Sequence, residues 1–244
     1  MLIPASRDNG RRCPLGLPVP PEELWRGQGP NVDHYLNVGK EHTENMRQAL
    51  KKHGFEMPDT ILDFGCGAGR MVRWLKPEAE RGVVWGCDIQ GEHIQWLQRH
   101  LRPPFRFFTS TTLPTLPFVD GYFGLIYAGS VFTHVGDLAQ AWLLELRRIV
   151  KPGGIAYLTI HDRETEKRIK IDGEKAIHLG VLEEYGGLPD DLGMLVLNRW
   201  PETAGTMVFH SHDWWRESLT PMFEILDIVE GAYGYQTAVV AQAV

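Results

Sequence analysis

The chain has 244 residues, 43% of them hydrophobic, which is enough for one substantial core in a single α/β domain. Its formal net charge of −6 argues against a general nucleic-acid binder, because such a protein needs a basic face to displace counterions. No apolar run reaches the roughly 20 residues of a membrane span, and the N-terminal stretch lacks the apolar segment of a secretory signal.

The N-terminal part differs in character from the rest of the chain. Residues 1–30 are rich in Pro, Gly and Arg and show no periodicity, so we expect an extended arm or cover there. Residues 33–54 carry a broken apolar stripe at helical spacing, which ends at Gly54. We therefore expect residues 1–54 to form an arm and a cover helix, and residues 55–244 to form the main domain.

From residue 60 onward, short apolar runs alternate with helical patterns. The runs predict strands over 60–65, 82–89, 105–110, 122–130 and 155–161. The helical patterns begin at "RMVRWL" and continue over 91–101 and 138–151, where Pro152, Gly153 and Gly154 supply a stop. This alternation predicts βαβ units and a doubly wound parallel sheet.

The C-terminal part breaks the alternation. Residues 162–209 are charged and have no clean period, so we expect a substrate-side insertion lying over the sheet. "HDWWRESLTPM" predicts a short helix, and two strand patterns follow, "FEILDIVE" and "YQTAVVAQAV". Their linker "GAYG" is too short for a crossover helix, so this pair should be antiparallel. The expected fold is an α/β, doubly wound, Rossmann-like sheet of seven strands, mostly parallel with an antiparallel C-terminal pair.

Three glycines, Gly65, Gly67 and Gly69, directly follow the first predicted strand. Glycine tolerates positive φ and lets a ligand lie against bare backbone. In a doubly wound sheet, ligands bind at the carboxyl ends of the strands. The helix expected after Arg70 adds free N–H groups and a positive dipole end, which suit a carboxylate or a phosphate. Both a dinucleotide and S-adenosylmethionine fit this turn.

The neighbouring residues separate the two cofactors. The third position of the dinucleotide pattern G-x-G-x-x-G is Arg70 here, which is bulky and charged. Asp63 stands in the strand just before the turn, where it would repel a phosphate and attract an ammonium or sulfonium group. Asp88 ends the second strand and can accept both hydroxyls of a ribose, which either cofactor has. The residues therefore favour S-adenosylmethionine.

Four segments taken together carry a family resemblance. In this order, "ILDFGCGAGR", "GCDI", "FGLIYAGSVFTHV" and "ELRRIVKPGGIAYLTI" resemble class I S-adenosylmethionine-dependent methyltransferases of the bacterial small-molecule type. The resemblance covers residues 55–160 most strongly. It implies S-adenosyl-L-methionine as cofactor and methyl transfer to an O or N nucleophile of a small-molecule acceptor, such as a sugar or other metabolite.

The resemblance also implies a set of cofactor-binding positions. They are Asp63, Gly65, Cys66, Gly67, Gly69 and Arg70 around the methionine end, Asp88 and Ile89 at the ribose and adenine, Ser110 and Thr111 at the adenine edge, and Ala128 and Ser130 near the methyl group. At the fourth strand, "AGSV" differs from the Asn/Asp-Pro-Pro-aromatic tetrad of adenine-N6 methyltransferases, so methylation of a nucleic-acid base is disfavoured.

Two histidines are candidate general bases. His134 follows the fourth predicted strand and His161 the fifth, and both strand ends face the cofactor side of such a sheet. For each, the alternative is a polar loop residue that makes one backbone bond. His134 could instead cap the helix that begins near Asp137.

The remaining reactive side chains have ordinary interpretations. His210 and His212 would share one face of a strand, as metal ligands could, but no further clear ligand accompanies them, so we expect no metal site. Cys66 and Cys87 are expected to act as small buried hydrophobic residues. With Cys13 they make no disulfide framework, so we expect reduced thiols in a cytoplasmic protein.

Two rival functions stay open at this point. One is an NAD(P)-dependent oxidoreductase, against which Arg70 and the antiparallel strand pair count. The other is a non-catalytic S-adenosylmethionine-binding protein that works as a partner of another protein. The sequence does not indicate an oligomeric state.

Overall fold

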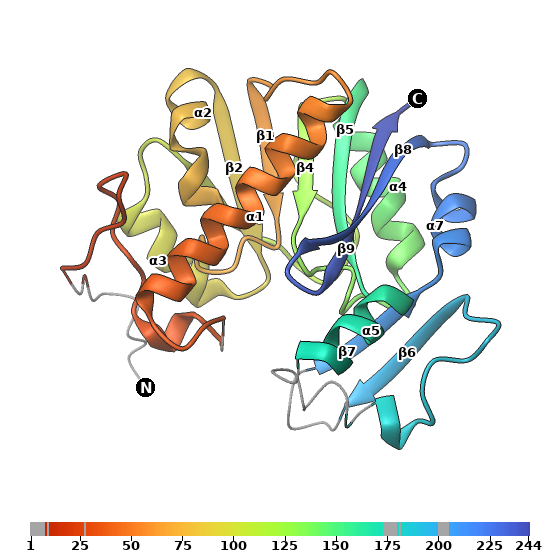
Figure 1. Cartoon of the computed structure of the whole chain (residues 1–244). Helices are drawn as coiled ribbons and strands as arrows, with labels where there is room; N and C mark the ends of the chain where they lie inside the picture. Colours follow the sequence, from red (N-terminus) through yellow and green to blue (C-terminus); the bar gives the residue numbers. More distant parts are fainter. Residues whose placement is uncertain (1–7, 9, 27, 173–179, 181, 200–204) are drawn as a thin grey trace.

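A seven-stranded sheet forms the centre of the protein, in a computed structural model that describes all residues except 1–7, 9, 27, 173–179, 181 and 200–204. The strand order is β3-β2-β1-β4-β5-β9-β8 (Figure 1). Strands β1 to β5 are parallel, and β9 is antiparallel to both β5 and β8. The predicted fold is confirmed. The strands are β1 Thr60–Phe64, β2 Val83–Asp88, β3 Arg106–Thr109, β4 Phe123–Ala128, β5 Val150–Ile160, β8 Phe223–Tyr233 and β9 Gln236–Ala243.

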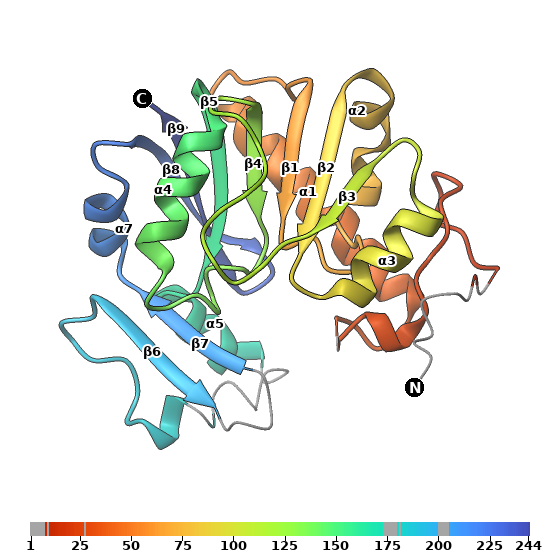
Figure 2. The ribbon, with the colours of Figure 1, turned by 180° about the vertical axis from the view of Figure 1, so that it is seen from behind.

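Helices cover both faces of this sheet. Helix α1 crosses the face seen in Figure 1, and α4 lies on the opposite face, seen in Figure 2. Each face buries its own apolar cluster, one with α1 and α3 and the other with α4 and α7. The helices are α1 Val32–Lys52, α2 Lys76–Arg81, α3 Gly91–His100, α4 Ala139–Ile149, α5 Arg163–Asp172 and α7 His212–Leu219, with 3₁₀ turns η2 Glu22–Leu24 and η3 Val72–Leu75.

The N-terminal segment packs onto the α1 face. Cys13, Val19 and Trp25 are buried in the same apolar cluster as the helix. The Trp25 ring stacks on Tyr35 of α1 at a centroid distance of 5.0 Å. Asn31 caps α1, because its side chain accepts a hydrogen bond from the His34 amide at 2.9 Å.

Two predicted boundaries differ from the structure. The helix expected from Arg70 starts later, as η3 at Val72, because Gly69 has a φ of +80°, which no helix allows. Strand β5 begins at Val150, ahead of the Pro-Gly-Gly sequence expected to precede it. A register shift against β4, between Phe123 and Leu125, accommodates these residues as a bulge.

The insertion contains a two-stranded antiparallel sheet that the sequence analysis did not predict. Its strands are β6 Met194–Arg199 and β7 Gly205–His210. The Val208 amide donates to the Thr133 carbonyl at 2.8 Å, and the His210 amide donates to the His161 carbonyl at 2.9 Å. The pair therefore docks at the carboxyl ends of β4 and β5, as Figure 1 shows. None of the described helices is long and apolar enough to cross a membrane.

Candidate cofactor and acceptor site

The glycine turn lies at the carboxyl end of β1, and all three glycines have positive φ: +81° at Gly65, +52° at Gly67 and +80° at Gly69. A Cβ on Gly65 would lie 2.3 Å from a methyl carbon of Val131, and one on Gly69 would lie 2.7 Å from Leu97. Packing therefore excludes side chains at these two positions. At Gly67 nothing lies within 4 Å of a Cβ position, so this backbone faces open space that a ligand can occupy.

Asp88 ties the end of β2 to this turn. Its Oδ2 accepts a hydrogen bond from the Gly67 amide at 2.8 Å, and its Oδ1 accepts one from the Gln90 amide at 2.8 Å. Each carboxylate oxygen keeps a further lone pair for a ribose hydroxyl.

The predicted adenine-side residues gather beside Asp88. Ile89 follows it directly, and its apolar side chain is 54% exposed. The Ser110 amide donates to the Asp88 carbonyl at 3.0 Å, and the exposed Thr111 comes next in the chain. The ends of β2 and β3 therefore bring these three predicted positions to one edge.

A small cavity of about 20 Å³ lies under the glycine turn. That volume holds about one water molecule, so the methionine end of a cofactor could enter only if side chains move. Gln28 is an exposed side chain on its wall and can turn aside. The lining residues are Gln28, Asp63, Gly65, Cys66, Gly67, Arg70, Met71, Gly129 and Tyr233.

Asp63 is buried in this cavity at 3% exposure, and its Oδ2 has no hydrogen-bond partner among the described residues. Burial raises the pKa of Asp63 to about 7. In register, Asp63 pairs with Tyr127 of β4, and the neighbouring Tyr127 hydroxyl and the Arg70 charge offset only part of the effect of burial on the Asp63 pKa. A cationic group next to Asp63 would favour its ionised form and lower this pKa.

Arg70 lies on the wall of the same cavity, at 8% exposure. Its guanidinium donates to the Tyr233 hydroxyl and lies 3.4 Å from Nδ1 of His42, and no carboxylate among the described residues pairs with it. Burial and the Arg70 charge lower the pKa of His42 to about 3, so His42 is neutral. The cavity thus holds an acid and a cation that form no ion pair among the described residues, and together they complement the ammonium and carboxylate of an α-amino acid.

The end of β4 carries Ala128, Gly129 and Ser130. Ala128 is fully buried, and Ser130 has a φ of +61°, a left-handed conformation that costs energy for a residue other than glycine. The Ser130 amide donates to Thr159 Oγ1 at 2.6 Å, and this hydroxyl donates to Gln236 Oε1 at 2.7 Å. Gln236 Nε2 donates back to Ser130 Oγ at 2.8 Å, so a closed hydrogen-bonded ring holds the strand end in place.

The two candidate bases differ in their surroundings. Nδ1 of His134 lies 2.7 Å from the Thr206 carbonyl, so it carries the proton and leaves Nε2 as the basic nitrogen of an exposed side chain. His161 is 1% exposed and lies against the rings of Phe209 and Tyr235, at centroid distances of 5.1 and 5.7 Å. The geometry favours His134 as the group that can exchange a proton with an acceptor.

The expected shared face of His210 and His212 is wrong. His210 ends β7, whereas His212 is the first residue of α7, where its Nε2 lies 2.8 Å from Asp162 Oδ2. No group of three or more His, Cys, Asp or Glu residues suited to a metal ion occurs in the part of the chain that the structure describes. Cys66 and Cys87 are buried, and burial raises the pKa of both thiols, so neither thiol is poised as a thiolate.

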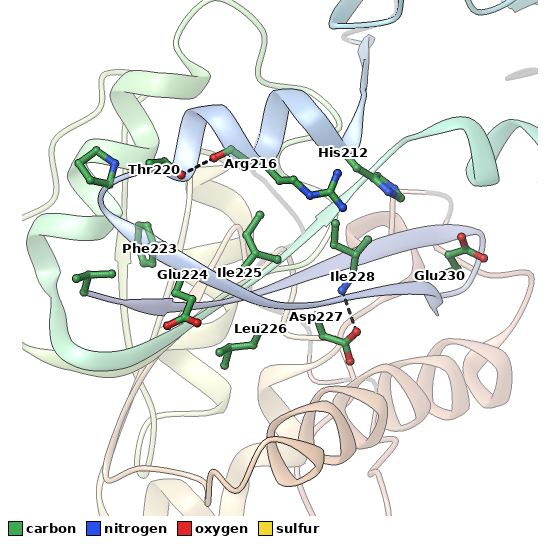
Figure 3. Close-up of a pocket in the computed structure, with 12 residues that line it drawn as sticks. His212, Arg216, Thr220, Phe223, Glu224, Ile225, Leu226, Asp227, Ile228 and Glu230 are labelled. Atoms are coloured by element: carbon green, nitrogen blue, oxygen red, sulfur yellow. Dashed lines mark hydrogen bonds between the residues drawn. The ribbon is translucent and has the colours of Figure 1, made fainter.

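A second, larger hollow of about 850 Å³ runs between α7 and the edge strand β8 (Figure 3). It shares no lining residue with the cavity under the glycine turn. Charged side chains and a bulge between Ile225 and Asp227 interrupt this strand, which are features that protect a sheet edge from pairing with another chain. Asp227 turns toward α1, where Lys52 pairs with it at 2.6 Å.

Comparisons with known proteins relate the chain to methyltransferases. Residues 62–158 match a family model described as a methyltransferase domain. A 2-phytyl-1,4-naphtoquinone methyltransferase of Trichormus variabilis is 27% identical over 175 residues, which cover 66% of this chain and 76% of that protein. A malonyl-[acyl-carrier protein] O-methyltransferase of Pseudescherichia vulneris is 31% identical over 125 residues, which cover 49% of this chain and only 47% of that protein.

The solved structures include a magnesium protoporphyrin IX methyltransferase from Synechocystis, determined with bound SAH (S-adenosylhomocysteine). It is 19% identical, has a TM-score of 0.57, and the match covers 91% of this chain and 92% of that one, which shows a shared fold. The comparisons support S-adenosylmethionine as the cofactor. Residues 62–158 therefore form a methyltransferase domain, and the chain has the fold of solved S-adenosylmethionine-dependent methyltransferases.

Proposed function

We propose that the protein transfers the methyl group of S-adenosylmethionine to an oxygen or nitrogen atom of a small-molecule acceptor. The observation that carries the proposal is the presence of both Asp63 and Arg70 on the wall of one buried cavity beside bare glycine backbone. An acid and a cation without partners are costly to bury, and a bound amino-acid group would pair both of them.

Within this site, each residue has a proposed role. Asp63 receives the ammonium group and Arg70 the carboxylate of the methionine end, while the open backbone at Gly67 lies against the ligand. Asp88 accepts the ribose hydroxyls, next to Ile89 at the adenine. Cys66 closes the cavity wall as a small buried thiol.

The proposed mechanism relies mainly on alignment. When bound, S-adenosylmethionine supplies a methyl group already activated on a sulfonium. The chain holds donor and acceptor in line, an effect worth about 7–11 kcal/mol in favourable cases. On this proposal His134 would hold the acceptor oxygen or nitrogen through Nε2 and would take its proton there as methyl transfer proceeds. Its Nδ1–H, fixed by the Thr206 carbonyl, supports this tautomer.

We further propose that the N-terminal segment and the insertion together enclose the reactants. Residues 1–54 cover the cofactor, since Gln28 lines the cavity and Trp25 stacks on α1. Residues 162–209 shape the acceptor side, since β7 bonds to the loop that carries His134. The named relatives differ in the acceptors their names give, so the acceptor is proposed only as a small molecule; the O-methyltransferase supports oxygen as one possible nucleophile.

Calorimetry with S-adenosylhomocysteine and NADH, side by side, tests the cofactor part of the proposal. We expect saturable binding of S-adenosylhomocysteine and none of NADH. Binding of NADH alone would end the proposal. Transfer of a labelled methyl group to a panel of hydroxyl, carboxyl and amine acceptors then tests turnover, and tight cofactor binding without transfer to any of them would favour the non-catalytic partner role.

A further inference from the structure

Tyr233 reaches the cofactor cavity from a distant part of the sheet. It is the last residue of β8, the edge strand, and β5 and β9 separate that strand from β4 in the sheet. Its side chain nevertheless lines the cavity with Asp63 and Gly67. A register shift between Val229 and Tyr233 turns the end of the β8–β9 hairpin away from regular pairing.

Gly129, at the end of β4, makes room for the Tyr233 ring. A Cβ at this position would lie 2.8 Å from Cε2 and 2.9 Å from the hydroxyl oxygen of Tyr233. The φ of Gly129 is outside the left-handed region, so the backbone conformation does not require glycine there. The absence of a side chain is therefore explained by the ring that occupies the space.

The ring is held in one orientation by two neighbours. The His42 ring lies 3.9 Å from it between centroids, and the Arg70 guanidinium lies 5.2 Å from its centroid. Arg70 also donates to the hydroxyl oxygen, which leaves the hydroxyl hydrogen of Tyr233 to be given to another acceptor. Burial raises the pKa of Tyr233, so the hydroxyl keeps that hydrogen at neutral pH.

We propose that Tyr233 binds the cofactor directly, by donating its hydroxyl hydrogen to the methionine carboxylate beside Arg70. This inference rests on the proposed function, because it assumes that the methionine end enters this cavity. Arg70 and the Tyr233 hydroxyl are two adjacent donors, and a carboxylate has lone pairs for both. Asp63 supplies the opposite charge for the ammonium group. The C-terminal hairpin thereby becomes part of the cofactor site.

The competing explanation is that Tyr233 only fills space between α1 and β4 or only orients Arg70. Tyr233→Phe removes the hydroxyl and keeps the ring. Tyr157→Phe is the matched control, because Tyr157 is a buried tyrosine on the same sheet face that does not line the cavity and whose hydroxyl has no hydrogen-bond partner among the described residues. Melting curves of both variants verify that they are folded.

Two ligands separate the explanations. S-adenosylhomocysteine carries the amino-acid end, and 5′-methylthioadenosine carries the adenosine and the thioether without it. We expect Tyr233→Phe to weaken S-adenosylhomocysteine binding about tenfold or more and to leave 5′-methylthioadenosine binding unchanged, since a hydrogen bond to a charged group is lost. Tyr157→Phe should change neither affinity.

Equal weakening of both ligands would assign Tyr233 a packing role and overturn the inference, as would unchanged binding of S-adenosylhomocysteine. In an Arg70→Met background, Tyr233→Phe should still weaken S-adenosylhomocysteine binding, and no further loss would mean that Tyr233 acts only through Arg70. A wild-type protein that binds 5′-methylthioadenosine but gains nothing from the amino-acid end would refute this inference together with the roles proposed for Asp63 and Arg70, whereas unchanged S-adenosylhomocysteine binding by Tyr233→Phe refutes this inference alone. Failure to bind either ligand would refute the proposed function.

Discussion

The cavity under the glycine turn and the hydrogen-bonded ring around Ser130 lie side by side at the carboxyl end of the sheet. They differ in whether their buried polar groups have partners. In the ring, Ser130, Thr159 and Gln236 satisfy one another in a closed circuit. In the cavity, Asp63 and Arg70 are buried but form no ion pair, with each other or with another described residue. Since an unpaired buried charge is costly, the contrast separates a structural element from a place prepared for a ligand.

The largest expected effect comes from closing the open side of the cavity. Gly67→Val should abolish measurable binding of S-adenosylhomocysteine, because the branched side chain would fill the ligand space at a φ of +52°. Gly16→Val is the matched control, since Gly16 has a φ of +77°, similar open space and no part in the cavity. Isothermal titration of both folded variants checks this, and normal binding by Gly67→Val would show that the ligand does not touch this backbone.

The next largest effect concerns turnover on the acceptor side. With an acceptor from the methyl-transfer screen, His134→Ala should lower kcat about 10²–10⁴-fold and leave cofactor affinity nearly unchanged, because a general base contributes at that level. His161→Ala should mainly lower the melting temperature, since that ring is packed and buried. A His134→Ala enzyme that is less stable but turns over at the wild-type rate would contradict the base role.

A smaller effect is expected at the ribose position. Asp88→Ala should weaken S-adenosylhomocysteine binding about 10–100-fold, because it removes a charged acceptor and also frees the Gly67 amide. Asp88→Asn keeps an acceptor oxygen, so its affinity for S-adenosylhomocysteine should lie between those of the wild type and Asp88→Ala. Equilibrium titration measures the series, and a folded Asp88→Ala protein with wild-type affinity would assign the ribose to another residue.

The smallest effect on binding is expected in the ring, where the change should affect stability instead. Gln236→Leu leaves the buried groups of Ser130 and Thr159 without partners and should cost about 1–3 kcal/mol of unfolding free energy. Gln242→Leu is the control, because Gln242 makes one exposed bond to the Gly153 carbonyl. Denaturant unfolding measures both. If Gln236→Leu lost cofactor affinity at unchanged stability, the hydrogen-bonded ring would belong to the ligand site, which would contradict its structural role.

The sequence predicts the sheet well because its strands are local features. Apolar runs such as Thr60–Phe64 and Phe123–Ala128 end at turn residues, and a four-residue linker dictates the antiparallel pair. The hairpin of β6 and β7 was not predicted. Its sequence does carry a signal, since the apolar runs "MLVL" and "MVF" are separated by a Pro- and Gly-containing linker. Charged residues on either side of these runs obscure the alternation that would identify strands.

The site residues also divide into those that a local motif marks and those that only the assembled fold brings together. Asp63 and Arg70 flank the glycine turn, so the motif brings them to notice, and the structure places both in one cavity. Tyr233 and His42 carry no local signal, because they meet Arg70 only after the C-terminal hairpin and α1 have packed against β4. Contacts between elements distant in the sequence depend on the assembled sheet and cannot be derived from spacing.

The central claim is that the Asp63 carboxyl group binds the ammonium group of the cofactor in its ionised form. Its pKa of about 7 lies above the ordinary value of 3.8, so ionisation costs the ligand-free protein stability as pH rises from about 4 to about 7. At pH 6 most Asp63 carboxyls are therefore protonated, and a bound ammonium group should displace that proton.

Calorimetric titration with S-adenosylhomocysteine at pH 6, in two buffers of different ionisation enthalpy, measures this exchange most directly. We predict a net release of protons on ligand binding by the wild-type protein and none by Asp63→Asn. Affinity of the wild type should rise with pH up to about 7. Binding without proton release, or the same release by Asp63→Asn, would contradict the account.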